Sequence, residues 1–193
     1  MINIHALSGR MGNEMFRHAY LYAQFRDGVI PDVYLQDFKY FDKYANEIKE
    51  IFGQGIGYLT QVGVHVRRGT NPTNLNEPKY IENPFYFNLC DTDYYEKAMA
   101  MFPNEKFLVF SDEPEWCKEK FKDNQDVQVM DKENDIDDFN LLASCKHQII
   151  ANSSFSWWAA YLNPNESKKI IAPARWYTDD VQRTVLPKEW IQI

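Results

Sequence analysis

The sequence predicts an α/β protein in which helices cover both faces of a parallel sheet. Short apolar runs of strand length alternate along the chain with segments whose apolar residues recur at helical spacing. Strands that take turns with helices form βαβ units, and the strands of such units run parallel. A hydrophobic content of 45% and an aromatic content of 16% supply a packed core, which excludes a disordered chain.

The expected elements follow from these patterns. Strands are predicted at Ile2–Leu7, Val62–Val66, Phe107–Phe110, Val127–Met130, Gln148–Ala151 and Ile170–Ala172. Helices are predicted at Asn13–Phe25, Tyr44–Phe52, Tyr94–Phe102, Glu115–Phe121, Asp137–Lys146 and Phe155–Leu162. Acidic residues in the first turn of the fifth helix suit the helix dipole. The stretch Arg26–Leu59 is expected to be a connector that holds one short helix.

Length, charge and cysteine usage narrow the class of protein. The 193 residues fit one compact domain, 1–193. A net charge of −7 argues against a protein that coats nucleic acid, whereas a buried phosphate site needs only one or two arginines. The three scattered cysteines are expected to be small buried hydrophobes in a reducing compartment. Without a leader-like N-terminus or a run of membrane-spanning length, the sequence predicts a cytoplasmic protein with no membrane span.

Three polar loops directly follow predicted strands, namely Arg67–Asn71, Ser111–Glu113 and Asn152–Ser156. The carboxyl ends of parallel strands meet at one edge of a sheet, and ligands bind beyond them. We therefore expect the three loops to form the binding site together.

The first loop begins with two arginines, which end the run Val64–Arg68. A guanidinium offers forked donors that match phosphate oxygens. Strand alternation puts His65 and Arg67 on one face and Arg68 on the other. We therefore expect Arg67 to bind phosphate and Arg68 to be structural. The alternative is a pair of surface arginines that offsets the negative charge of the chain.

The third loop places an asparagine and three serines where a strand turns into a helix. Several hydroxyls at a helix N-terminus, together with its N–H groups, form an anion site. The expected ligands are Ser153, Ser154 and Ser156. The alternative is helix capping plus serines present by chance. The adjacent Trp157 and Trp158 are expected in the core.

Two weaker signals accompany these loops. Asp112 ends another strand and can accept from the N–H donors of guanine, although it can equally well cap the next helix. Gly9 and Gly12, next to Asn13, permit a close backbone approach to a ligand, although a tight turn is the default interpretation.

No metal or cofactor is expected. Asp91 and Asp93 have the Asp-x-Asp spacing that holds a metal and a nucleotide diphosphate in many enzymes, but they stand at a predicted helix start. His5, His18 and His147 lack metal-ligand spacing.

These motifs resemble those of glycosyltransferase family eleven, the α-1,2-fucosyltransferase-like proteins. Blocks in the family's order run over nearly the whole chain, at Gly9–Ala23, Tyr34–Phe41, Val62–Gly69, Phe110–Phe121, Leu141–Asn165, Ile170–Tyr177 and Leu186–Ile193. The fragment Cys145–Leu162 is specific by itself.

The resemblance implies an inverting, metal-independent transferase that moves L-fucose from GDP-fucose to a glycan hydroxyl, with a galactoside-type acceptor. It implies a Rossmann-like fold that is a reduced version of a two-lobed (GT-B-like) one. Residues 1–60 would form the reduced N-terminal part, and residues 61–193 would bind the nucleotide sugar.

The resemblance also assigns roles to residues. Arg67 would be catalytic, because it would hold the β-phosphate and stabilise charge on the departing GDP. His65 and Asp112 would lie near guanine. Ser153, Ser154 and Ser156 would hold the diphosphate, and Gly9, Gly12 and Asn13 would line the cleft from the opposite side.

Two departures from the family pattern leave turnover open. Thr70 stands where the pattern His-x-Arg-Arg-x-Asp ends in aspartate, and only Arg26–Val33 and their neighbours replace a much longer segment. One alternative is therefore a catalytically degenerate module that binds a GDP-sugar or a glycan, and another is transfer of a different sugar from a different nucleotide. No catalytic base is assigned; the candidates are Glu14, Asp37 and Glu113.

Overall fold

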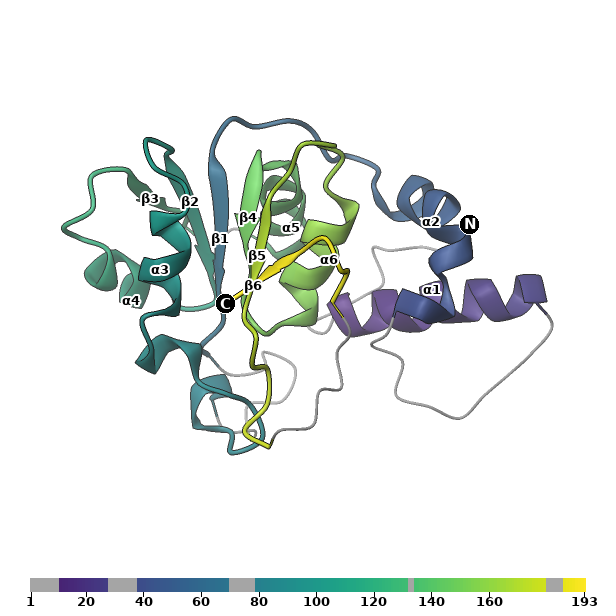
Figure 1. Ribbon diagram of the computed structural model, residues 1–193, viewed down its shortest axis with the longest axis horizontal. Coiled ribbons are helices and arrows are strands. Elements are labelled where there is room, and N and C mark those ends of the chain that lie inside the picture. The colour runs from purple at the N-terminus through teal and green to yellow at the C-terminus, as the bar shows by residue number, and fades with distance from the viewer. Residues whose placement is uncertain (1–10, 28–37, 70–78, 132–133, 180–185) are drawn as a thin grey trace.

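A six-stranded parallel sheet forms the centre of the molecule. The computed structural model describes residues 11–27, 38–69, 79–131, 134–179 and 186–193. The strands in these ranges are β1 (Val62–Val66), β2 (Phe107–Ser111), β3 (Val127–Val129), β4 (His147–Ile149), β5 (Ile170–Ala172) and β6 (Ile191–Gln192). Their order is β3-β2-β1-β4-β5-β6, as can be followed across Figure 1. This all-parallel order confirms the predicted α/β, Rossmann-like class.

β1 holds the middle of the sheet because it pairs on both sides. Val64 lies opposite Val109 of β2 and also opposite Ile149 of β4. All five residues of β1 are buried, as expected for a strand covered on both faces.

Six α-helices accompany the strands in the described residues. They are α1 (Met11–Asp27), α2 (Ala45–Phe52), α3 (Tyr94–Ala100), α4 (Pro114–Lys120), α5 (Asp135–Ser144) and α6 (Ser154–Leu162). Every predicted helix is present with ends shifted by no more than two residues. Short 3₁₀ turns at Phe38–Tyr40 and Asp42–Tyr44 lead into α2, so the connector is more helical than expected.

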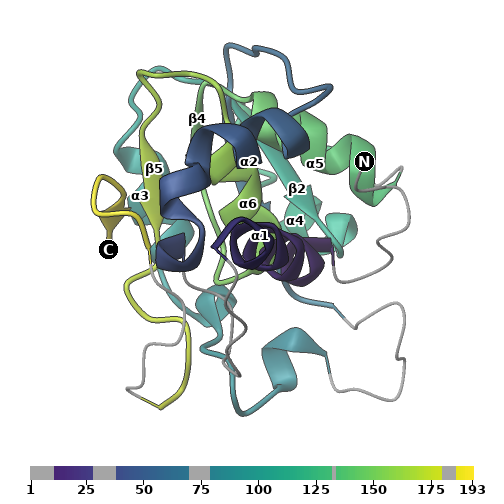
Figure 2. The same cartoon turned by 90° about the vertical axis from the view of Figure 1, so that its right-hand side faces the viewer.

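Helices cover both faces of the sheet, and each face has its own core. On one face, Val62, Val64 and Val66 of β1 pack with residues of α3 and α4. On the other face, residues of α1, α2, α5 and α6 pack together. Figure 2 shows α1 and α2 as an outer layer over α6.

Aromatic side chains fill the second core. Trp157 and Trp158 of α6 are both fully buried. The ring of Phe16 in α1 lies 4.5 Å from that of Trp157, and the ring of Phe41 stacks on Trp158 at 5.5 Å. The prediction that the two tryptophans belong to the core is confirmed.

Expectations about the remaining strands, the cysteines and a membrane span can also be compared with the structure. The strand predicted at Ile2–Leu7 lies outside the described residues. The strand β6 was not predicted, because it has only two residues and both are exposed. All three cysteines are free and buried, as expected. Within the described ranges, no helix is both long and apolar enough to cross a membrane.

Gly12 brings α1 against the start of α6. A Cβ atom at this position would lie 2.5 Å from the backbone oxygen of Ser154 and 2.6 Å from the nitrogen of Phe155. Backbone atoms of a neighbouring helix cannot give way as a flexible side chain can. Gly12 therefore allows α1 to pack closely on the first turn of α6. The sequence predicted a close approach to a ligand instead, and that contact stays a prediction.

We predict that Gly12→Ala lowers the free energy of unfolding by about 1–3 kcal/mol, because the added methyl overpacks this contact. The gain in helix propensity from alanine, up to about 1 kcal/mol, opposes this effect. Urea denaturation measures the difference. Gly57→Ala is the matched control, because a Cβ there would meet only Ser144 Oγ, at 3.8 Å. Equal stabilities for the two variants would contradict the assigned contact.

Candidate functional site

The strand order changes direction between β1 and β4. β2 and β3 continue the sheet on one side, and β5 and β6 continue it on the other. In open parallel sheets, ligands bind at the carboxyl ends of the strands that flank such a point. Residues 67–69 follow β1, residues 112–113 follow β2 and residues 150–153 follow β4. The three predicted loops therefore leave the same edge, although the first is described only as far as Gly69.

Asp112 organises the loop after β1. Its Oδ1 accepts a hydrogen bond from the backbone N–H of Arg68 at 2.9 Å. Its Oδ2 accepts from the backbone N–H of Gly69 at 2.8 Å and from the guanidinium of Arg67. The alternative that Asp112 caps the next helix is wrong, because Glu113 stands at the N-cap of α4. A contact between Asp112 and guanine stays a prediction, and both oxygens already have protein donors.

Gly69 lets this loop fold over the carboxylate. A Cβ at Gly69 would lie 3.0 Å from Asp112 Oδ2 and 3.3 Å from Asp112 Cγ. A larger residue would therefore push the loop away from Asp112, and the glycine of the motif supports the position of Arg67.

Arg68 points away from Arg67. Its Nε donates to Glu113 Oε2 at 3.2 Å, and its guanidinium lies 3.8 Å from the centre of the Trp116 ring. Glu113 also accepts from Lys79 Nζ at 2.8 Å. Burial alone would raise the pKa of Glu113, but the hydrogen bonds from Lys79 and Arg68 outweigh burial and lower it. Arg68 thus ties the loop to α4, as expected of a structural arginine.

Arg67 remains partly open to solvent, with 22% of its side chain exposed. Its guanidinium lies 5.5 Å from the centre of the Tyr80 ring, within the range of a cation–π contact. Held by Asp112 and flanked by Tyr80, it presents a positive charge at the carboxyl edge of the sheet. We call the region between residues 67–69, 112–113 and 150–153 the crevice.

Tyr80 joins the loops that follow β1 and β4, and no pattern in the sequence indicates this role. Its backbone N–H donates to Gly69 O at 3.0 Å, and its hydroxyl donates to Asn152 O. Its ring stacks on Tyr86 at 4.3 Å. Tyr80 falls in the stretch Asn71–Asn83, which has the composition of an ordinary polar loop.

His65 is buried in β1 beneath this edge. Its ring stacks on Phe155 of α6, with 5.1 Å between the ring centres. Burial, and then the charge of Arg67, lower its pKa to about 3, so the imidazole is neutral at physiological pH. Its Nδ1 has no hydrogen-bond partner among the described residues.

The serine cluster divides into two groups. Ser153 and Ser154 are half-buried at the start of α6, and the hydroxyl of Ser153, at the N-cap, accepts no capping hydrogen bond. Ser156 is fully buried, and its Oγ lies 3.3 Å from the carbonyl oxygens of Ala151 and Ser153. The structure therefore leaves Ser153 and Ser154 near the crevice and places Ser156 beneath the turn.

Asn152 is also structural. It is 4% exposed, and its Nδ2 donates to Phe87 O at 2.8 Å and to Trp176 O at 2.9 Å. These bonds hold the segments around residues 87 and 176 against the end of β4.

Other sequence predictions are placed as follows. Asp91 accepts from Asn88 Nδ2 at 2.9 Å, and Asp93 pairs with Lys97 at 2.9 Å, so both carboxylates have local partners. No group of three or more metal-ligating side chains occurs among the described residues. Gly9, Asp37 and Thr70 and the side chains of Asn13 and Glu14 lie outside the described part.

We predict that Arg68→Met lowers the free energy of unfolding by about 1–3 kcal/mol, because it leaves Glu113 short of a charged donor and removes the stack on Trp116. Arg67→Met is the matched comparison. It should cost about 1 kcal/mol or less, because Asp112 keeps its two backbone donors. Urea denaturation checks both values, and a larger loss for Arg67→Met would refute the division of roles.

His65 should make stability depend on pH. Since its folded pKa of about 3 is below the ordinary 6.5, the folded state resists protonation, and stability falls as pH drops below 6.5. Between pH 7.5 and pH 5.5 this group alone should cost about 1.4 kcal/mol. Denaturation of the wild type and of His65→Gln at both pH values isolates the effect. The same pH dependence in the two proteins would contradict the burial of a neutral imidazole.

Comparison with known proteins identifies the relatives of this chain. Glycosyl transferase family 11 matches residues 16–193. An α-1,2-colitosyltransferase of Escherichia coli is 31% identical over 180 residues, which cover 82% of this chain and 60% of the relative. The O-antigen biosynthesis glycosyltransferase WbnK of Escherichia coli is 31% identical over 137 residues, which cover 67% and 43%.

A mammalian enzyme extends the comparison. Galactoside α-(1,2)-fucosyltransferase 1 of Homo sapiens is 31% identical over 141 residues, which cover 66% of this chain and 37% of the relative. The chain thus spans 60% or less of the length of these relatives. With the match over residues 16–193 and a Rossmann-like sheet, the chain belongs to glycosyltransferase family 11.

Proposed function

We propose that this protein transfers L-fucose from GDP-fucose to a hydroxyl of a galactoside-type glycan, with inversion at C1 and without a metal. The observation that carries the proposal is the position of Arg67, a fixed cation at the carboxyl end of β1. Family membership supports a transferase, and two of the three named relatives are an α-1,2-colitosyltransferase and a galactoside α-(1,2)-fucosyltransferase.

The proposed reaction is an in-line displacement. The acceptor hydroxyl attacks fucose C1 on the face opposite to GDP, and the bond between C1 and the β-phosphate oxygen breaks. Negative charge then grows on the leaving diphosphate, where Arg67 stabilises it in a site that needs no reorganisation. The proton of the acceptor hydroxyl passes to a base or to solvent. Glu113 is a poor candidate for that base, because its carboxylate already accepts hydrogen bonds from Lys79 and Arg68.

The start of α6 supplies a second anion-binding element. Backbone N–H groups of a first helical turn lack partners within the helix and favour phosphate oxygens. Ser153 and Ser154 add hydroxyls at that position, and α6 follows the strand adjacent to the one that carries Arg67. We assign the diphosphate to the space between these groups.

The guanine would lie nearer to His65 and Asp112. His65 offers a neutral ring and a buried Nδ1 without a partner among the described residues. Asp112 keeps spare lone pairs on both oxygens, since a carboxylate has about four acceptor sites.

The expectation that Gly12 lines the opposite side of the cleft is wrong, because Gly12 packs directly on the backbone of Ser154 and Phe155. Gly12 would therefore lie on the same side of the diphosphate as the first turn of α6, and the roles of Gly9 and Asn13 stay predictions.

A second candidate function is a module that binds a GDP-sugar or a glycan without turnover. Thr70 favours it, because this residue stands where the family pattern His-x-Arg-Arg-x-Asp ends in aspartate. The same crevice would serve both functions, so binding and turnover must be measured separately.

We predict that isothermal titration detects binding of GDP and GDP-fucose and no comparable binding of UDP-sugars. Arg67→Met should weaken GDP binding at least about tenfold, because one charge-assisted contact to phosphate is lost. Lys97→Met, which removes a surface cation from α3, is the control and should bind as the wild type does. A lack of GDP binding at millimolar ligand would overturn both candidate functions.

A GDP-release assay with simple galactosides then separates the two candidates. Release that depends on the acceptor and is lost in Arg67→Met is the expected result. GDP binding without release on any acceptor would replace the transferase with the binding module.

A further inference from the structure

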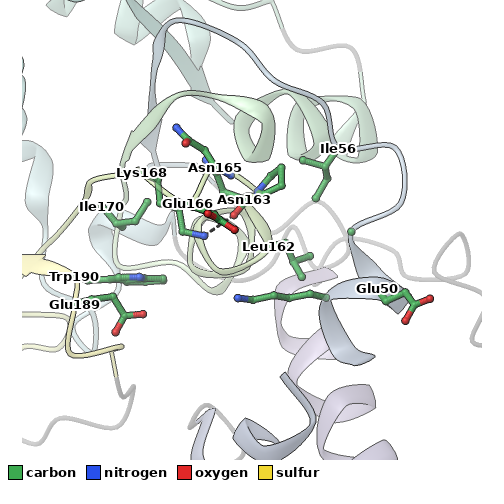
Figure 3. A pocket seen from close by; sticks show the side chains of 13 residues that line it. Glu50, Ile56, Leu162, Asn163, Asn165, Glu166, Lys168, Ile170, Glu189 and Trp190 are labelled. Atoms are coloured by element: carbon green, nitrogen blue, oxygen red, sulfur yellow. Dashed lines mark hydrogen bonds between the residues drawn. The ribbon is translucent and has the colours of Figure 1, made fainter. Parts of the chain in front are cut away.

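A cavity of about 710 Å³ (Figure 3) lies around the start of β5 and the segment before β6. It opens between α2, the loop that runs from the end of α6 to the start of β5, and the segment before β6. Leu162, Ile170 and Trp190 line it with buried apolar surface. Its size falls within the range of sites that hold small molecules.

Lys168 carries an amine into this cavity. Its Nζ donates to the carbonyl oxygen of Asn163 at 2.5 Å, as the dashed line in Figure 3 shows. An ammonium has three donors, and the described residues supply no further acceptor. Burial, and then the charge of Lys49, lower the pKa of Lys168 to about 8, against a smaller opposite effect of Glu189. Among the described residues, the ammonium form therefore has no carboxylate in direct contact, and Glu189 acts on it only from a distance.

Lys49, from α2, adds a second cation. Its Nζ lies 5.1 Å from the centre of the Tyr161 ring. Within the described part of the chain, no carboxylate lies within 4.0 Å of Lys49 or Lys168. Other lysines do form ion pairs, namely Lys79, Lys97, Lys118, Lys120, Lys122 and Lys146. Lys106, Lys169 and Lys188 also lack an ion pair with any described residue, but they are exposed, as Lys49 is. Lys168 is half-buried, so its ammonium is the group that needs a counter-charge.

The glutamates of the cavity do not form ion pairs with Lys49 or Lys168. Glu50, Glu166 and Glu189 line it, but all three are exposed. Carboxylates in these positions accept hydrogen bonds from ligand hydroxyls and repel a ligand that carries several negative charges. The cavity thus has one half-buried amine, that of Lys168, while Lys49 and the three glutamates are exposed around it.

We propose that this cavity binds a hydroxylated monocarboxylate of the uronic acid class, whose carboxylate pairs with Lys168 and Lys49. Charge-assisted hydrogen bonds from the two amines supply the missing counter-charge. The three exposed glutamates accept from the sugar hydroxyls, and the apolar lining covers the C–H groups of the ring. The site lies apart from the crevice at Arg67 and does not depend on the transferase reaction.

Nuclear magnetic resonance with the full chain tests the proposal. Glucuronate, glucose and inorganic phosphate are titrated separately, and the Cε signals of the lysines are followed against pH. Glucuronate should shift the signals of the cavity residues and raise the pKa of Lys168 from about 8 toward the ordinary 10.5. Binding should therefore take up protons at pH 8.5 and weaken as pH rises further.

Variants distinguish this site from general attraction of anions. Lys168→Met should weaken glucuronate binding at least about tenfold, and Lys49→Met should weaken it less. Lys168→Arg should keep binding and lose the proton uptake, because arginine stays charged, and this variant covers the case in which Lys168→Met fails to fold. Lys169→Met removes an exposed neighbouring lysine outside the cavity and is the matched control.

Three results would overturn the proposal. Glucose must bind more weakly than glucuronate, so equal affinities would refute the role of the carboxylate. Phosphate binding without glucuronate binding would refute the ligand class. Unchanged affinity in both Lys168→Met and Lys49→Met would show that the carboxylate binds elsewhere.

Discussion

The carboxylate of Asp112 is the constraint on which the proposed active site depends. It sits at the end of β2 and accepts from two backbone N–H groups and one guanidinium of the loop after β1. Because β1 and β2 are paired in parallel register, the carboxylate and its donors leave the same edge. The loop therefore has a fixed path, and Arg67 keeps one position without a bound ligand. A charge held in advance in this way is what electrostatic catalysis requires.

Residues on the two faces of β1, and those directly after it, have different roles. His65 faces α6, and the valines of β1 face α3 and α4. After the strand ends, Arg67 remains at the crevice while Arg68 turns to Glu113 and Trp116. The contact of Gly12 with α6 holds α1 against the second anion-binding element. Arg68 thus stabilises the fold, whereas the adjacent Arg67 is available to bind a ligand.

Much of this arrangement could be predicted from local patterns in the sequence. Apolar runs located β1, β2 and β5 closely, and alternation along β1 separated Arg67 from Arg68. Other features need contacts between distant segments, which a local pattern does not contain. Tyr80 gains its role only when the loops after β1 and β4 meet, and Ser156 is internal because backbone carbonyls of its own turn reach its hydroxyl. Both the partners of Asp112 and the cavity at Lys168 depend on such distant contacts.

A crystal structure of the chain with GDP bound is the most direct test of the central claim. We expect the β-phosphate to lie against the guanidinium of Arg67 and the first turn of α6, with Asp112 still bound to the N–H groups of Arg68 and Gly69. GDP bound at another edge of the sheet, or a loop released from Asp112 in the complex, would contradict this claim.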